Sequence, residues 1–413
     1  MYQALYRKYR PRSFSDVLGG VDVAGQQYIT ETLRRQIIGD KLSHAYLFVG
    51  TRGTGKTTCA KILSRAVNCL NQTDGNPCNK CISCVGIEDG SILDVLELDA
   101  ASNNGVDDVR AMRDEAIYSP ASVKKRVYIV DEVHMLSTPA FNALLKILEE
   151  PPEHIIFILA TTELHKVPAT ILSRCQKFSF KRLSSDEIMK RLKLIASNEE
   201  LTLTDEAAEK LAVLADGSMR DGISLLDQCA HSKEIDLEHV LETIGLAGQE
   251  ELLKISKAVA TGDITALLEI LNKLYENGKD MAALLNELTG FFRDMLIVQL
   301  SPESSLIAAG VPRGELIELS KTFTNERLIY CLTTLKDAMS GLSRGGVSRL
   351  MLELCLIRMC DEALSDDSTA LASRISKLEK NHSSITNSAQ GEVKDSVLDP
   401  LDRISSFDIV KFE

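Results

Sequence analysis

The stretch Gly50-Thr51-Arg52-Gly53-Thr54-Gly55-Lys56-Thr57 decides how the first part of this sequence is interpreted. Its spacing is that of a phosphate-binding loop, because it follows an apolar run and precedes a helical pattern. The backbone amides of such a loop surround a β-phosphate, and the dipole of the following helix adds to the attraction. We therefore expect these eight residues, together with Thr58, to bind ATP. Lys56 would contact the β- and γ-phosphates, and Thr57 would offer its hydroxyl to Mg²⁺.

A second apolar run, residues 127–130, predicts a buried strand that ends at Asp131 and Glu132. Ligands of open parallel sheets bind at the carboxyl ends of the strands. We expect Asp131 to serve Mg²⁺ and Glu132 to act as general base toward water. A capping pair at a strand end is the alternative, and the nearby phosphate loop disfavours it. Residues 131–134 also match a helicase-like DExH box, in which His134 either couples to the site or packs beneath it.

Three further residues outside these motifs are candidates for the site. Thr161 follows the apolar run 155–160 and could hold the attacking water, with Thr162 as the second choice. Arg174 follows a short helical segment, and a plain surface role is its alternative. Arg220 stands at a predicted helix start, where it could reach the phosphate from a lid or pair with Asp221.

The order of elements predicts an α/β fold followed by an all-α region. Residues 1–182 alternate strand-like runs with amphipathic helices, which is typical of a doubly wound parallel sheet. Short helices follow over 183–243 and longer helices over 244–365, while 366–413 is polar and expected to be disordered. The strand candidates are residues 45–49, 93–98, 127–130 and 155–160, and the longer helices include 281–300, 325–340 and 348–363.

Composition limits the class of protein. The chain has 413 residues and a formal net charge of -12, so contact with DNA should be confined to a local surface. No apolar run approaches the length of a membrane span, and the basic N-terminus lacks the apolar core of a signal peptide. We therefore expect a cytoplasmic protein without membrane contact.

Four of the ten cysteines cluster directly after the helix that follows the phosphate loop: Cys69, Cys78, Cys81 and Cys84. Four thiolates this close in sequence can close a tetrahedral zinc site with no open position, which indicates a structural role. The run Cys-x2-Cys-x2-Cys also occurs among iron–sulfur ligands, and free thiols are the third alternative. Zinc is the favoured interpretation.

The order of these motifs closely resembles the gamma/tau subunit family of bacterial DNA polymerase III, the AAA+ motor of the sliding-clamp loader. The likeness is strong over residues 1–243 and rests on helical character over 244–365. The motifs are Tyr9-Arg10-Pro11, the phosphate loop, the four cysteines, Asp131–His134, Glu149-Glu150-Pro151-Pro152, Ala160-Thr161-Thr162, Ser173-Arg174-Cys175 and Gly217–Asp221.

The resemblance implies a RecA-like sheet with an inserted zinc module, a helical lid and a helical collar. It implies that Arg174 is an arginine finger for a neighbouring subunit and that Arg220 is the sensor in the lid. It places residues 9–11, Val17 and Leu18 beside the adenine, although Leu18-Gly19-Gly20 stands where the family usually has Val-Gly-Gln. A chain of this length resembles the short, gamma-like form.

The implied activity is ATP-driven opening of the beta clamp and its loading onto primed DNA during replication. The implied partners are the delta and delta-prime subunits, further copies in a pentameric ring, the beta clamp and primed DNA. The assembly is a DNA-directed DNA polymerase, a nucleotidyltransferase, but this sequence shows no polymerase site of its own. Residues 100–110, which enter a helix, could face DNA phosphates or form an ordinary capped helix. A DExH-type helicase and a non-hydrolysing replication scaffold are the alternatives.

Overall fold

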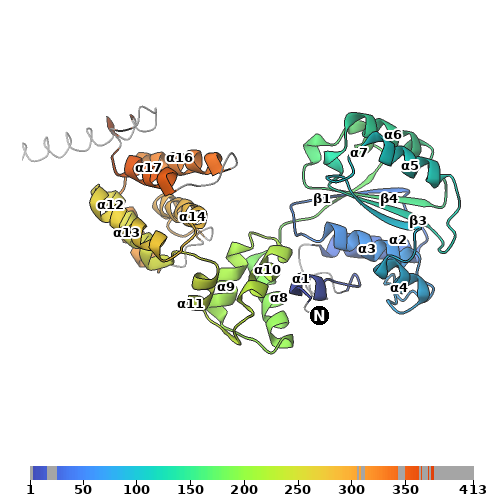
Figure 1. Ribbon diagram of the computed structural model, residues 1–413, viewed down its shortest axis with the longest axis horizontal. Helices are drawn as coiled ribbons and strands as arrows, with labels where there is room; N and C mark the ends of the chain where they lie inside the picture. The colour runs from blue at the N-terminus through green and yellow to red at the C-terminus, as the bar shows by residue number, and fades with distance from the viewer. Residues whose placement is uncertain are drawn as a thin grey trace, which may run out of the picture. The chain divides into compact units, whose positions relative to one another are not determined.

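The computed structural model describes residues 3–15, 26–304, 307, 312–342, 349–361, 364, 371, 374 and 375. The chain forms two compact units, Met1–Ile244 and Gly245–Glu413. Figure 1 colours the first unit blue to green and the second yellow to red. Val17 and Leu18, which we expected beside the adenine, lie outside the described residues, as does most of the expected disordered tail.

A five-stranded parallel sheet forms the centre of the first unit. Its strands lie in the order β2-β3-β4-β1-β5. The three inner strands are buried almost throughout, because apolar side chains point toward both faces. The strands are β1 (Ala45–Val49), β2 (Val95–Asp99), β3 (Arg126–Asp131), β4 (Ile155–Thr161) and β5 (Gln176–Ser179).

Helices cover both faces of this sheet, so the predicted parallel α/β fold is confirmed (Figure 1). One apolar core joins the sheet to α2 (Gln27–Ile38) and α3 (Lys56–Val67). The other core joins it to α5 (Val106–Ala116), α6 (Thr138–Glu149) and α7 (Ala169–Leu172). Ser137 caps α6 by accepting a hydrogen bond from the amide of Ala140, as its position before the helix predicts.

The two edge strands differ from the sequence-based expectation. Strand β5 was not predicted, because only Phe178 among its four residues is buried and apolar. Strand β2 was predicted over 93–98 as a strand buried on both faces, and this is wrong: it begins at Val95 and is largely exposed. An edge strand contacts a neighbour on one side only, so it needs fewer apolar residues than an inner strand.

After the main sheet, the described part of the first unit continues with four helices and a two-stranded parallel sheet. The predicted helix start at Ser184 is confirmed: its hydroxyl accepts a hydrogen bond from the Glu187 amide, and the Glu187 carboxylate accepts one from the Ser184 amide. Helix α1 (Leu5–Lys8) packs against this group, with Leu5 in its core. The elements are α8 (Ser185–Asn198), β6 (Thr202–Leu203), α9 (Asp205–Leu214), α10 (Met219–Cys229), β7 (Glu234–Ile235) and α11 (Leu237–Thr243).

Every described element of the second unit is a helix, as predicted for this region. Its core is rich in Leu, Phe and Met side chains, with Leu288, Phe292 and Met295 fully buried. Among the described residues, no helix is both long enough and apolar enough to cross a membrane. The helices are α12 (Gln249–Thr261), α13 (Ile264–Glu276), α14 (Met281–Leu300), α15 (Arg313–Ser320), α16 (Asn325–Leu342) and α17 (Arg349–Cys360).

Candidate functional site

The loop between β1 and α3 is shaped by two glycines in the left-handed region of backbone conformation. Gly53 has φ 76° and Gly55 has φ 98°, values that other residues adopt only with strain. A Cβ atom on Gly53 would lie 1.8 Å from the hydroxyl of Ser218, the residue that caps α10. The loop therefore lies directly against the helical part of the first unit, a contact that the sequence did not predict.

Lys56 begins α3 and is 5% exposed. Its ammonium group donates hydrogen bonds to the carbonyls of Gly50 and Thr51, both at 2.9 Å. Burial lowers the pKa of Lys56, and the nearby carboxylates of Glu132 and Asp131 counteract that effect. These contacts hold a cation within the concave side of the loop, where a phosphate would accept hydrogen bonds from it.

Thr57 and Asp131 meet at the end of β3. The Thr57 hydroxyl donates a hydrogen bond of 2.6 Å to the Asp131 carboxylate. An oxygen pair of this kind, one hydroxyl and one carboxylate, suits the hard ligand preference of Mg²⁺. The structure thus brings together the two residues that the sequence assigned to magnesium.

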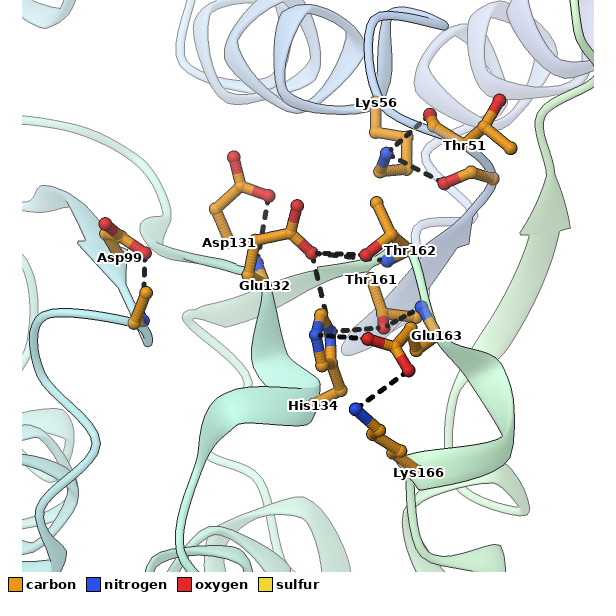
Figure 2. A network of polar contacts seen from close by, with 12 residues as sticks. Thr51, Lys56, Asp99, Asp131, Glu132, His134, Thr161, Thr162, Glu163 and Lys166 are labelled. Atoms are coloured by element: carbon orange, nitrogen blue, oxygen red, sulfur yellow. Dashed lines mark hydrogen bonds and ion pairs between the residues drawn. The ribbon is translucent and has the colours of Figure 1, made fainter. Parts of the chain in front are cut away.

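Glu132 lies one residue beyond, with a left-handed backbone of φ 48°. Figure 2 shows its carboxylate between Thr162 and His134. The carboxylate accepts hydrogen bonds from the Thr162 hydroxyl at 2.9 Å and from the Thr162 amide at 3.3 Å. His134 Nδ1 lies 3.4 Å from the same carboxylate. The strand end thereby fixes a carboxylate at a definite orientation.

The two neighbouring threonines have different surroundings. The Thr161 hydroxyl is buried, lies 3.0 Å from His134 Nδ1 and accepts a 3.0 Å hydrogen bond from the Glu163 amide. Only Thr162, our second choice, contacts Glu132 directly. His134 contacts both Thr161 and Glu132, so it packs beneath the site and is also connected to it.

A cavity of about 620 Å³ opens beside the loop. Arg10 lines it and donates a hydrogen bond of 3.1 Å from Nε to the Thr58 hydroxyl, and burial lowers the pKa of this arginine. The guanidinium of Arg220 lies 5.2 Å from the ring centre of Tyr6. The lining also includes Gln3, Arg7, Tyr9, Pro11, Gly53, Gly55, Lys56, Thr57, Lys61, Glu88, Arg191, Met219 and Ile223.

Arg174 is not among the residues that line this cavity. Its guanidinium pairs with Glu149 at 2.7 Å and donates to the carbonyl of Thr170 at 2.8 Å. Both of these partners also lie outside the lining of the cavity. The Arg174 side chain is one-third exposed, so it is accessible to another molecule.

The segment expected to face DNA forms a turn that leads into α5. The helix begins at Val106, and no side chain caps it. Asp107 and Asp108 stand in its first turn, where their charges oppose the approach of a phosphate. A DNA contact here remains a prediction.

The four clustered cysteines come together in space: their sulfur atoms all lie within 4.8 Å of one another. A tetrahedral zinc–thiolate site with bonds of about 2.3 Å places its sulfurs about 3.8 Å apart, close to the 4.0 Å between Cys78 and Cys84. The cluster connects α3 to α4 (Ile82–Asp89). The donor set and its compactness therefore fit one metal ion.

Backbone amides point at these sulfurs. The amide of Cys78 donates to Cys69 at 3.2 Å, that of Cys81 to Cys78 at 3.3 Å and that of Cys84 to Cys81 at 3.4 Å. Burial opposes ionisation of Cys81, but hydrogen bonds from the amides of Leu70 and Cys84 and from the thiols of Cys84 and Cys78 together outweigh it, and the pKa falls to about 6. Such donors stabilise thiolates, the form that binds metal.

Comparison with known families divides the chain into three matched segments. Residues 25–184 match the family model for DNA polymerase III, delta subunit. Residues 187–233 match the ATPase lid domain of the DNA polymerase III clamp loader subunit. Residues 235–373 match domain III of DNA polymerase III subunits gamma and tau.

The chain belongs to the gamma/tau family of DNA polymerase III subunits. It is 45% identical over 362 residues to DNA polymerase III subunit tau of Bacillus subtilis, and the matched region covers 87% of this chain and 63% of that protein. It is 36% identical to subunit tau of Escherichia coli, covering 86% and 55%, and 39% identical to subunit gamma/tau of Mycobacterium tuberculosis, covering 91% and 66%. The chain thus spans just over half to two-thirds of these relatives.

Proposed function

We propose that this gamma/tau family member is an ATPase motor subunit of the bacterial clamp loader. One observation carries the proposal: Lys56, Thr57, Asp131 and Glu132 gather at one edge of the sheet, beside a cavity of about 620 Å³. A cation, a hydroxyl–carboxylate pair and a held carboxylate are the parts that ATP hydrolysis requires. ATP binding and hydrolysis would open the beta clamp and load it onto primed DNA.

Each residue has a chemical role in this proposal. The loop amides of 50–55, Lys56 and Thr58 would hold the phosphates, and Thr57 with Asp131 would hold Mg²⁺, which neutralises phosphate charge when bound. Glu132 would orient and deprotonate the attacking water, and Thr162 keeps its carboxylate in place through the 2.9 Å hydrogen bond. Thr161, whose hydroxyl contacts His134 and the Glu163 amide, would act on Glu132 indirectly, through His134. Arg10 lies where it could contact the nucleotide.

The two arginines would act from different chains. Arg220 lines the cavity of its own chain and would sense bound nucleotide from the lid. Arg174 is not among the residues that line that cavity and is partly exposed, which favours a role at the ATP site of a neighbouring subunit. The ring of clamp-loader subunits, with delta and delta-prime, would place it there, and the second unit would form the collar.

We also propose that the cysteine cluster holds one structural zinc ion. The closeness of the four sulfurs supports a single ion over an iron–sulfur cluster, whose ligands are spread over several irons. Four protein ligands leave no open position for a substrate.

The proposed setting is the cytoplasmic replication machinery. The chain would be part of the DNA-directed DNA polymerase assembly, a nucleotidyltransferase, without a polymerase site of its own. The protein would contact the sugar–phosphate backbone of primed DNA and would not recognise the base sequence.

ATPase assays on the reconstituted loader test the proposal. Turnover should be weak for the chain alone and rise strongly with delta, delta-prime, beta clamp and primed DNA. Lys56→Ala should abolish turnover. Arg174→Ala should leave nucleotide binding unchanged and lower turnover at least a hundredfold in the complex, because an arginine finger contributes about 10³ or more. Absence of stimulation by clamp and DNA would contradict the proposal.

Neither alternative has a supporting observation of its own. A helicase of the DExH type needs a second RecA-like domain, and the described residues contain one sheet of five strands and one of two. A scaffold without hydrolysis would not need the Thr57–Asp131 pair or the held Glu132. A strand-separation assay on the chain alone distinguishes the helicase.

A further inference from the structure

The N-terminal strap, residues 3–15, is attached at its first end to the helical part of the first unit. Leu5 is buried in that core, and its amide donates to the Asp227 carboxylate at 3.3 Å. Lys8 pairs with Glu199 at 2.5 Å, and the Tyr9 hydroxyl donates to the same carboxylate. This end of the strap is therefore attached to helices α8 and α10.

The cysteine module, residues 69–84, holds the other end of the strap. Asn76 accepts a hydrogen bond from the Phe14 amide at 2.9 Å and donates one to the Ser15 hydroxyl at 3.3 Å. Asn79 donates to the Arg12 carbonyl at 3.1 Å. Both asparagines lie between the first and third cysteines of the cluster, so the loop that the cysteines close also orients these two side chains.

The middle of the strap forms one wall of the nucleotide cavity. Its residues Tyr6, Tyr9, Arg10 and Pro11 all line the cavity, and Arg10 reaches Thr58 of α3. Helix α4, which continues from the module, also reaches the cavity, because its Glu88 lines the cavity and pairs with the buried Arg65 of α3. The strap thus passes from the helical part, along the cavity, to the cysteine module.

We infer that Asn76 and Asn79 of the cysteine module are positioning residues that anchor the strap and thereby set the affinity of the cavity for ATP. The inference rests on the proposed ATP site and gives the module a role beyond the stability of its own loop. Without the hydrogen bonds of Asn76 and Asn79, residues 12–15 would still be held by the buried Phe14 side chain and by the hydrogen bond from Arg65 to the Arg12 carbonyl. The cavity wall would be fixed less firmly at this end, while its attachment to α8 and α10 would remain. Nucleotide binding would then have to order that wall, and this cost would weaken binding.

Substitutions in the full chain test this inference. Asn76→Leu has a similar volume but removes both hydrogen bonds to the strap, whereas Asn76→Asp keeps the acceptor for the Phe14 amide. Asn79→Gly removes the bond to Arg12 and suits the left-handed backbone at this position, φ 55°. The matched control is Arg34→Ala, which removes an ion pair from α2 to Asp74 of the same module without touching the strap.

Three measurements are made on each variant: the Kd for a fluorescent ATP analogue with Mg²⁺, the zinc content per chain, and hydrogen exchange of the peptide that contains Phe14. We expect Asn76→Leu and Asn79→Gly to raise Kd at least fivefold, with zinc unchanged and faster exchange at Phe14. Asn76→Asp and Arg34→Ala should stay within twofold of the unaltered chain.

Two results would overturn the inference. One is an unchanged Kd in the Asn79→Gly variant, or an unchanged Kd in the Asn76→Leu variant when that variant still contains zinc. The other is a raised Kd without faster exchange at Phe14, which would mean that the effect bypasses the strap. If the unaltered chain fails to bind the analogue, the proposed function itself falls, and the anchoring role falls with it.

Discussion

At the scale of single residues, Glu132 depends on a partner from another strand. Thr162 follows β4 and holds the Glu132 carboxylate by its hydroxyl and its amide. A hydrogen bond to a charged group contributes about 1.5–3 kcal/mol. Loss of the hydroxyl should therefore free the carboxylate to adopt orientations that are unproductive for catalysis.

Thr162→Val should lower ATP turnover about tenfold, because about 1.4 kcal/mol of positioning free energy is lost from the transition state. The Kd for ATP should stay unchanged, since the side chain bonds a carboxylate and not the phosphate loop. Single-turnover hydrolysis and a binding titration measure the two quantities. Thr162→Ser keeps the hydroxyl and should retain most of the activity; equal losses in both variants would count against the role.

The sequence could predict those site residues that belong to a short, contiguous pattern. Lys56 and Thr57 belong to one contiguous motif, and Asp131 and Glu132 end one apolar run, so a pattern within a few residues suffices. The hydrogen bond from Thr162 to Glu132 joins residues that directly follow two neighbouring strands and lie 30 positions apart. Only the order of strands in the sheet reveals that contact.

At the scale of elements, the phosphate loop and helix α10 are in direct contact. Gly53 lies so close to the Ser218 hydroxyl that no Cβ atom fits between them. The loop and the helix belong to parts of the chain more than 160 positions apart. No sequence pattern indicates which glycine of the loop contacts the helix. This contact ties the conformation of the loop to the helix that begins beside Arg220.

Gly53→Ala should unfold more readily and bind ATP poorly, because alanine meets both a strained backbone and the Ser218 side chain. Gly90→Ala is the matched control, since Gly90 has φ 81° but open space around its missing Cβ. Backbone strain alone costs about 1 kcal/mol, so the control should lose about that much stability and keep its ATP affinity. Thermal melts and a titration compare them.

The double variant Gly53→Ala with Ser218→Gly separates the two effects. Glycine is tolerated as a helix cap at a cost of a few tenths of a kcal/mol, and it removes the clashing atoms. Partial recovery of ATP affinity is expected. No recovery would show that backbone strain, and not the contact with α10, explains the defect.

The elements themselves were predictable to different degrees. The inner strands are continuous apolar runs, which specify a buried parallel strand without further information. Strand β5 has the polar sequence Gln176-Lys177-Phe178-Ser179 and owes its conformation to pairing with β1. Tertiary pairing, and not local preference, decides such a strand.

At the scale of the whole chain, the two units have separate apolar cores. The proposed ATP site lies entirely within Met1–Ile244. A ligand stabilises only the part of the protein that binds it in the folded state.

Calorimetry of the full chain should therefore show two unfolding transitions. ATP with Mg²⁺ should raise the midpoint temperature of only one of them. At a ligand concentration 100 times Kd the stabilisation is about 2.7 kcal/mol. A fragment of residues 1–244 should show the ATP-sensitive transition alone. A shift of both transitions by ATP would mean that the units unfold together.

The position of β4 has a consequence for how this family can vary. The strand pairs with β1 on one side, where Val49 lies opposite Thr161, and with β3 on the other, where Val130 lies opposite Leu159. One inserted or deleted residue in β4 would displace its tip from both neighbours at once and turn its side chains to the opposite faces. Evolution can thus exchange side chains along this strand, but it is not free to change the strand's length.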